Sequence, residues 1–197
     1  AKPEWIIVKD LDASVYAWMV YHKSSGATKY LQLNATDGES TLSTIWNNTE
    51  PTNSVFSIGT NGSVNSGTNN YIAYVWHSVD GFSKFEKYTG NGSTDGTFVY
   101  TGFAPRFLII KRINTTGGWF MWDTERQRFN PNGTYLEAQR DSAEDVQNST
   151  VYIDFVSNGF KIRGTSSALN TSSSTYAYMA FAEHPFVGDG TSPVTAR

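Results

Sequence analysis

The sequence of 197 residues has no cysteine, little charge and no long apolar run, and each absence excludes a class of protein. Without cysteine there is no disulfide framework, thiolate metal site or cysteine nucleophile. Lysine and arginine number 15 against 18 acidic residues, so the chain lacks the basic surface that sequence-independent nucleic-acid binding requires. No apolar run is long enough to span a bilayer as a helix. We therefore expect neither nucleic-acid binding nor membrane insertion.

Aromatic and small polar residues are abundant instead. The chain has 6 Trp, 11 Tyr and 12 Phe, together with 21 Ser, 22 Thr and 15 Asn. Short apolar or aromatic runs alternate with Asn-Gly and Asp-Gly pairs, which tolerate the positive φ angles of tight hairpin turns. Amphipathic helix patterns are scarce. The composition and the regular turn signals predict an all-β protein built of short strands.

The sequence contains an internal repeat. Residues 3–9 match residues 105–111 at an offset of 102, and the same offset places residues 17–20 beside 119–122. An offset of 104 places Ala73-Tyr74 beside Ala177-Tyr178. Because these matches keep their order and apolar phase, we predict a duplication. The expected architecture is two tandem related antiparallel β-sandwich units, jelly-roll-like, covering residues 1–84 and 85–197.

The two units differ at their beginnings. Residues 96–104 read as a strand running into a glycine turn ahead of Pro105. Only Ala1 and Lys2 stand ahead of the equivalent Pro3. We therefore expect that the matching strand of the first unit is supplied by upstream sequence, and that the chain is the C-terminal part of a longer polypeptide.

Several long motifs resemble a known family. Residues 71–85, 87–96 and 99–107, together with 178–186, resemble a block found in tailed-bacteriophage virion proteins, particularly tail fibres, spikes and other appendages, often after laminin-G-like domains. The resemblance implies a non-enzymatic structural or adhesive module on the virion surface, made in the host cytoplasm. It further implies a homotrimer that contacts other virion proteins and a glycan or receptor on the host cell. A head decoration or collar protein is one alternative.

A capsule-degrading hydrolase is the other alternative, because paired carboxylates are the groups that cleave glycosidic bonds. The close pairs are Asp10 with Asp12, Asp123 with Glu125, and Glu144 with Asp145. Arg126 and Arg128 follow the second pair, so solvated turns or ion pairs are the simpler interpretation. At the offset of 102, Asp123 matches Tyr21, so the repeat does not reproduce these carboxylates. We predict no catalytic residue.

Trp46, Asn47 and Asn48 are the candidate ligand-binding residues, because aromatic faces stack on sugars and amides bond their hydroxyls. The second unit has no Trp at the place equivalent to Trp46, but core packing is still the default role for this side chain. His22, His77 and His184 are too widely spaced to predict a shared zinc site. The sequence predicts no metal and no cofactor.

Overall fold

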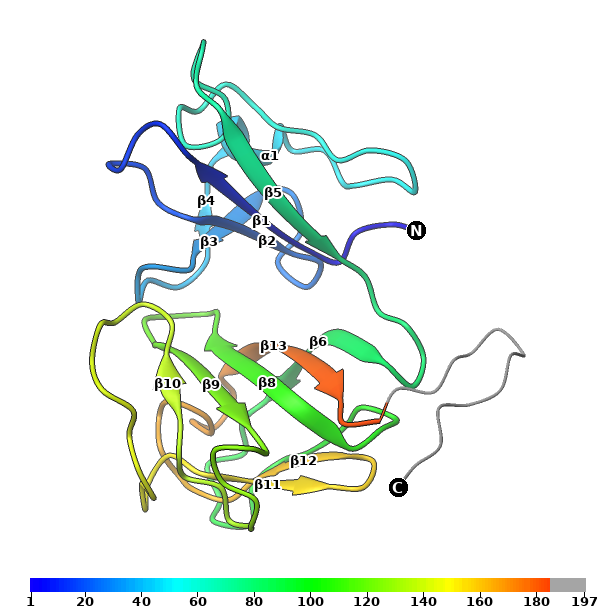
Figure 1. Ribbon diagram of the computed structural model, residues 1–197, viewed down its shortest axis with the longest axis vertical. Coiled ribbons are helices and arrows are strands. Elements are labelled where there is room, and N and C mark those ends of the chain that lie inside the picture. The colour runs from blue at the N-terminus through cyan, green and yellow to red at the C-terminus, as the bar shows by residue number, and fades with distance from the viewer. Residues whose placement is uncertain (185–197) are drawn as a thin grey trace. The chain divides into compact units, whose positions relative to one another are not determined.

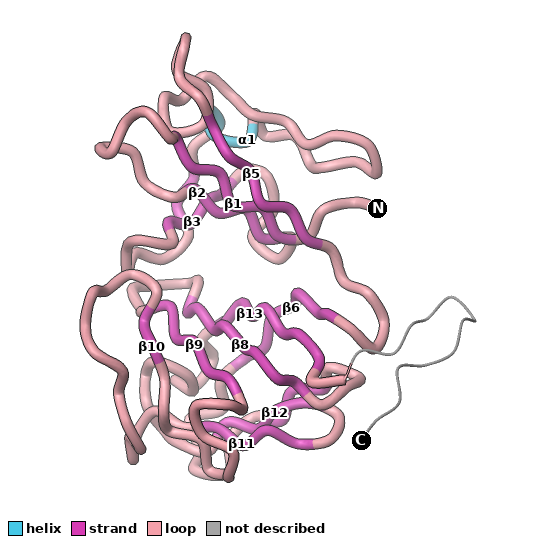
Figure 2. Tube along the Cα trace, in the orientation of Figure 1, coloured by secondary structure: helices cyan, strands magenta, loops and turns pink. Residues whose placement is uncertain are grey.

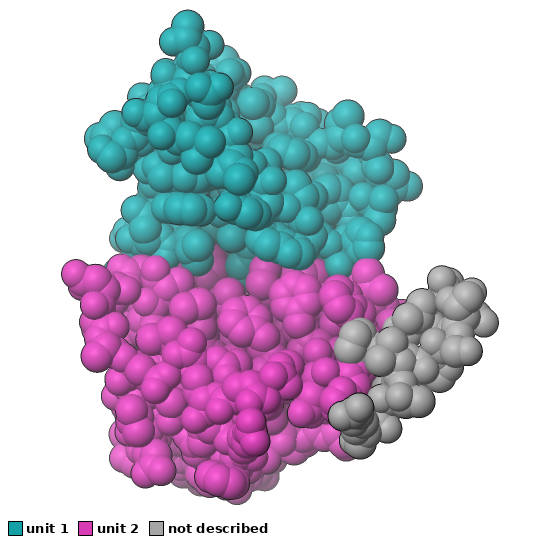
Figure 3. Space-filling model, in the orientation of Figure 1, with its two compact units in different colours: residues 1–77 teal, residues 78–197 magenta. Residues whose placement is uncertain are grey.

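The computed structural model describes residues 1–184 and consists of antiparallel β-strands, with one short helix among the described residues (Figures 1 and 2). The predicted all-β fold is confirmed. Two compact units cover residues 1–77 and 78–197 (Figure 3). The boundary expected between residues 84 and 85 falls inside β6 (Ser83–Thr89), which is paired along its length with β13 (Thr175–Ala182). This pairing places the whole of β6 in unit 2.

Unit 1 is a five-stranded sheet in the order β4-β3-β2-β1-β5. Its strands are β1 (Trp5–Asp10), β2 (Met19–His22), β3 (Lys29–Gln32), β4 (Ser40–Thr41) and β5 (Tyr71–Trp76). Helix α1 (Ser43–Trp46) and the loop of residues 47–70 supply the layer opposite the sheet. The core joins Ile6, Val8, Met19 and Tyr21 of the sheet with Ile45, Trp46 and Val64.

Unit 2 is a sandwich of two sheets. The larger has the order β10-β9-β8-β13-β6, and the smaller has the order β11-β12-β7. The strands not yet given are β7 (Phe98–Tyr100), β8 (Pro105–Arg112), β9 (Trp119–Asp123), β10 (Leu136–Glu137), β11 (Ile153–Val156) and β12 (Gly159–Ile162). Fully buried side chains of both sheets form one core, with Leu108 and Trp122 from the larger and Ile153 and Phe160 from the smaller.

The large sheets of the two units share a strand order, since β3-β2-β1-β5 corresponds to β10-β9-β8-β13. Their registers agree when the second strand is offset by 101 residues: Trp5 pairs with His22, and Phe107 pairs with Asp123. The earlier match of Asp123 to Tyr21 is corrected accordingly. His22 and Asp123 also act alike, because each side chain accepts the backbone N–H two residues later, at 3.1 and 3.0 Å.

Each unit also has a tyrosine loop, residues 61–71 and 166–176. The Tyr71 hydroxyl accepts the N–H of Ser66 and donates to the carbonyl of Gly62, both at 2.7 Å. The Tyr176 hydroxyl accepts the N–H of Thr171 at 2.9 Å and donates to the carbonyl of Ser167 at 3.0 Å. The offset here is 105, one more than the sequence match of Ala73-Tyr74 indicated. The duplication stays a prediction, but both hydrogen bonds of the tyrosine hydroxyl are repeated at equivalent residues.

Candidate functional site

Trp46, the first predicted binding residue, lies in the core of unit 1. Its side chain is 2% exposed and meets the ring of Tyr21 edge-on, with ring centroids 6.0 Å apart. Asn47 and Asn48 are exposed and adopt left-handed φ angles of 53° and 49°, which end the helix. Trp46 therefore presents no free face on which a sugar ring could stack, and the two asparagines shape a chain reversal.

The first carboxylate pair fixes a loop to the end of β1. Asp10 is buried and accepts the N–H groups of Asp12 and Ala13 at 2.8 and 2.9 Å, and Nδ2 of Asn69 at 2.8 Å. Burial acts to raise the pKa of Asp10, but the hydrogen bond from Asn69 and those from the backbone outweigh it and lower the pKa to about 2. Asp12 accepts both the backbone and side-chain N–H of Asn70.

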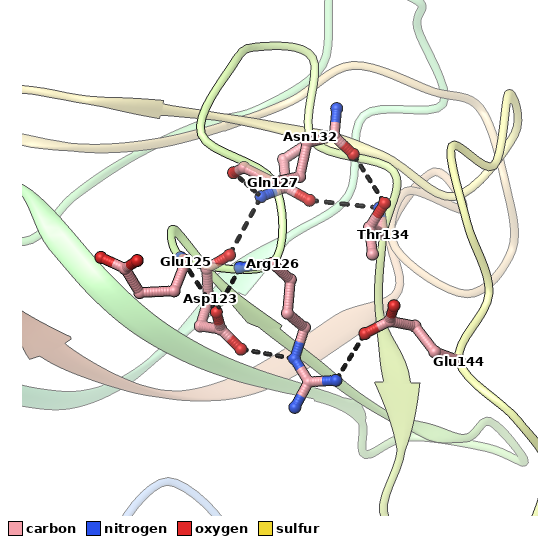
Figure 4. A network of polar contacts seen from close by, with 7 residues as sticks. All are labelled: Asp123, Glu125, Arg126, Gln127, Asn132, Thr134 and Glu144. Atoms are coloured by element: carbon pink, nitrogen blue, oxygen red, sulfur yellow. Dashed lines mark hydrogen bonds and ion pairs between the residues drawn. The ribbon is translucent and has the colours of Figure 1, made fainter.

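The second pair stands in a polar network after β9 (Figure 4). One oxygen of Asp123 accepts the N–H groups of Glu125 and Arg126, and the other accepts Nε of Arg126 at 2.5 Å. The same guanidinium donates to Glu144 at 2.5 Å. Burial acts to raise the pKa of Asp123, but the hydrogen bonds from Arg126 prevail and lower it.

Glu125 is held between two arginines, with Arg128 at 2.6 Å on one oxygen and Arg106 at 2.7 Å on the other. The hydrogen bonds from Arg128 and then Arg106 lower the pKa of Glu125. Of the two simpler interpretations, a solvated turn or an ion pair, the structure has the ion pairs, Asp123 with Arg126 and Glu125 with Arg128. Both carboxylates are consequently ionised at neutral pH.

An open hollow of about 520 Å³ lies beside this network in unit 2. Its polar lining includes Glu125, Gln127, Arg128, Asn130 and Glu183. Phe155 and Pro105 add apolar surface. The hollow thus combines hydrogen-bonding side chains of both charge signs with a smaller apolar part.

The wall of the hollow is held in place by the loop of residues 124–134. Oε1 of Gln127 accepts the hydroxyl of Thr134 at 2.8 Å. The Asn130 side chain donates from Nδ2 to the carbonyl of Phe155 at 2.7 Å and accepts the N–H of Phe155 at Oδ1 at 3.0 Å. Between these anchors, Arg128 is largely exposed and Phe129 is 76% exposed. The sequence reasoning missed these residues, although an aromatic inside a polar loop is a signal that could have found Phe129.

The family model described as a domain of unknown function (DUF7483) matches residues 1–185. The chain belongs to the DUF7483 family. No curated protein and no solved structure matches it.

The remaining candidate groups of this DUF7483 chain are engaged locally. Among residues 1–184, no three His, Asp or Glu side chains gather as a metal site would require, and no helix is long and apolar enough to cross a membrane. His22 is buried against Trp5, and its Nδ1 accepts a backbone N–H. Asp95, in the glycine-rich loop between β6 and β7, is ion-paired with Lys161, whose hydrogen bond lowers the pKa of Asp95.

Proposed function

We propose that this chain is a non-enzymatic structural and adhesive module of a bacteriophage tail fibre or related virion appendage, and that the hollow of unit 2 contacts a glycan on the host surface. Two things support the proposal. Residues 71–107 and 178–186 resemble phage appendage proteins. The hollow has a polar lining that includes one aromatic residue, Phe155, and carbohydrate ligands favour this combination.

The observation that carries the adhesive role is the fixed polar wall of the hollow. Gln127 and Asn130 are held by bonds to Thr134 and to the backbone of Phe155. A wall that is already ordered loses little conformational entropy when it binds a ligand. Arg128 adds N–H donors for hydroxyl or carboxylate oxygens, and Phe155 adds apolar surface.

The same geometry is the reason we favour adhesion over hydrolysis. Glycoside hydrolysis requires one carboxyl group that stays protonated near neutral pH, which means a raised pKa. The pKa values of Asp123 and Glu125 are both lowered, and arginines already bond to both side chains. This carboxylate pair therefore suits electrostatic binding rather than proton donation.

An appendage of this kind would act through several copies. A shallow, open site binds one glycan weakly, and linked copies raise the effective concentration of the second and third contacts. We propose a homotrimer for this reason, in contact with other virion proteins. Light scattering coupled to gel filtration measures the stoichiometry directly, and a monomer at micromolar concentration would contradict the trimer.

Cell binding and glycan arrays with the purified 197-residue chain test adhesion. Arg128→Ala should weaken binding by roughly tenfold, because it removes a charged donor from the lining of the hollow. Leu11→Ala, at a side chain that is 60% exposed in unit 1, is the matched control and should bind as the unaltered chain does. Failure of the unaltered chain to bind cells or glycans would refute adhesion and leave a purely structural role.

Viscosity of capsular polysaccharide tests the enzymatic alternative separately. The chain should leave the viscosity unchanged over hours. A fall in viscosity that Asp123→Ala abolishes, with the variant still folded by circular dichroism, would replace the adhesive proposal by a hydrolase.

A further inference from the structure

The last strand of the large sheet is flanked differently in the two units. In unit 2, β13 pairs with β8 on one side and β6 on the other. Its counterpart β5 pairs with β1, and no described residue pairs with its outer edge. The β5 sequence contains no charged residue and no proline, which are the usual means of protecting an edge strand. β5 is thus an edge that can accept a further strand.

The core-side face of β5 is also uncovered. Ile6 and Val8 of β1 are buried in the core, and their cross-strand partners Val75 and Ala73 share that face. Val75 is nevertheless 45% exposed, and Ala73 is exposed as well. The equivalent side chains of β13, Ala180 and Tyr178, are exposed by 0% and 1%. The same position in the sheet is therefore interior in one unit and surface in the other.

Strands β6, β7 and β12 make the difference in unit 2. Tyr88 of β6 stacks on Tyr176 at 5.0 Å between ring centroids, and Phe160 of β12 meets Tyr178 edge-on at 5.3 Å. Val99 of β7 pairs with Phe160 and is buried. These three strands close the sandwich over β13.

Unit 1 has the counterpart of β12 but leaves it unpaired. The Asn65 side chain donates to the carbonyl of Gly59 at 3.1 Å, as Asn170 donates to that of Gly164 at 3.1 Å, so the two glycines are equivalent. The residues ahead of Gly164 form β12, with Phe160 and Ile162 fully buried. Those ahead of Gly59 form no strand, and Val55 and Ile58 are 61% and 41% exposed.

We propose that unit 1 binds a two-stranded polypeptide segment of the kind that residues 83–104 supply to unit 2. One strand adds to the outer edge of β5, and the next lies beside residues 55–58 and covers Ala73 and Val75. In unit 2, β6 and β7 directly precede β8, so a segment of this kind placed directly ahead of β1 has the same connection to unit 1. Main-chain hydrogen bonds provide the affinity and alternate apolar side chains the specificity.

A graft tests the proposal. A second copy of residues 83–104 replaces Ala1 and Lys2, so that the copied Ala104 joins Pro3 as it joins Pro105 in unit 2. Amide hydrogen exchange of β5 should slow by roughly tenfold or more, because its edge amides gain partners. The amides of β13 serve as the internal reference and should exchange at an unchanged rate.

A matched graft with proline in place of the copied Lys84 and Glu86 lacks the N–H groups that face the neighbouring strand, so it cannot pair as a strand and should leave β5 exchange unchanged. A folded graft with no slowing at β5 would overturn the proposal. So would a dimer of the ungrafted chain in which β5 is already protected and in which Val75→Lys abolishes both dimer and protection, because the occupant would then be a second copy.

Discussion

The two units contain the same sheet, but only one of them is closed around it. Unit 2 covers its sheet with a second, three-stranded sheet, whereas unit 1 uses a one-turn helix and a long loop. The tyrosine loops and the registers agree in both, so these features depend on local sequence. Burial of the last strand differs, so it depends on strands contributed from outside the repeated part. Matched substitutions at equivalent positions separate these two contributions.

Truncation on the core face of the last strand should give the largest effect. Tyr178→Ala removes a ring that is 1% exposed and packed against Phe160, and should destabilise unit 2 by about 3–5 kcal/mol. Val75→Ala, on the equivalent face of β5, should change stability by less than about 0.5 kcal/mol. Urea unfolding followed by circular dichroism measures both. Equal losses would mean that Val75 is covered in solution.

The asparagines of the tyrosine loops should come next. Asn170 is fully buried and bonds to Asn91, Ser93 and Gly164, so Asn170→Ala should cost about 2–3 kcal/mol by leaving buried groups unsatisfied. Asn65 is exposed and donates one bond, so Asn65→Ala should cost about 0.5–1 kcal/mol. Calorimetric melting temperatures rank the two variants. A larger loss for Asn65→Ala than for Asn170→Ala would contradict the prediction that the buried asparagine contributes more.

Removal of one hydroxyl should have a smaller effect in each unit. Tyr176→Phe and Tyr71→Phe each delete the oxygen that bridges two backbone groups, and each should cost about 1–2 kcal/mol. Faster hydrogen exchange of Thr171 and Ser66, whose N–H groups lose their acceptor, would identify the cause. A change confined to one unit would show that the two loops are not energetically equivalent.

Acid should distinguish the units most subtly, at the end of their first strands. The folded-state pKa of Asp10 is lowered from 3.8 to about 2, so its contribution to stability is complete above pH 4 and is lost as the pH falls through about 2. Arg112, a basic residue, occupies the equivalent position in unit 2. Asp10→Asn should therefore flatten the acid limb of the stability profile. Titration of Asp10 near its ordinary value, observed by carboxyl NMR, would contradict this.

The strands were largely predictable because their local patterns are strong. Residues 5–8, 71–77 and 107–110 read as strands, and the structure has strands there. The predicted domain boundary divided β6, in which Lys84, Glu86 and Lys87 separate the apolar residues and weaken the strand pattern. The offset of 102 holds for β1 and β8 but is one too large for the second strand, and the offset of 104 is one too small for the last strand. Residue identity was matched, whereas backbone pairing sets the register.

The candidate site was not predictable for a different reason. Trp46 is aromatic and unmatched in the second unit, but a four-residue helix such as α1 is stable only through its buried contacts, which a single sequence does not reveal. The hollow in unit 2 is assembled from residues 104–105, 124–125, 127–128, 130, 155–157 and 183. Their proximity follows from sheet topology rather than from spacing along the chain.

The ion pairs at the start of the first strands have reversed polarity. Glu4 pairs with Lys23 in unit 1, whereas Arg106 pairs with Glu125 in unit 2. If β1 were to pair with β9 while the chain folds, Glu4 would meet Glu125, and the reciprocal error would bring Arg106 to Lys23. Each mistake juxtaposes like charges, whereas each correct pairing joins opposite ones. The opposite polarity of these ion pairs thus favours pairing of each strand with its own neighbours over exchange between two similar sheets of one chain.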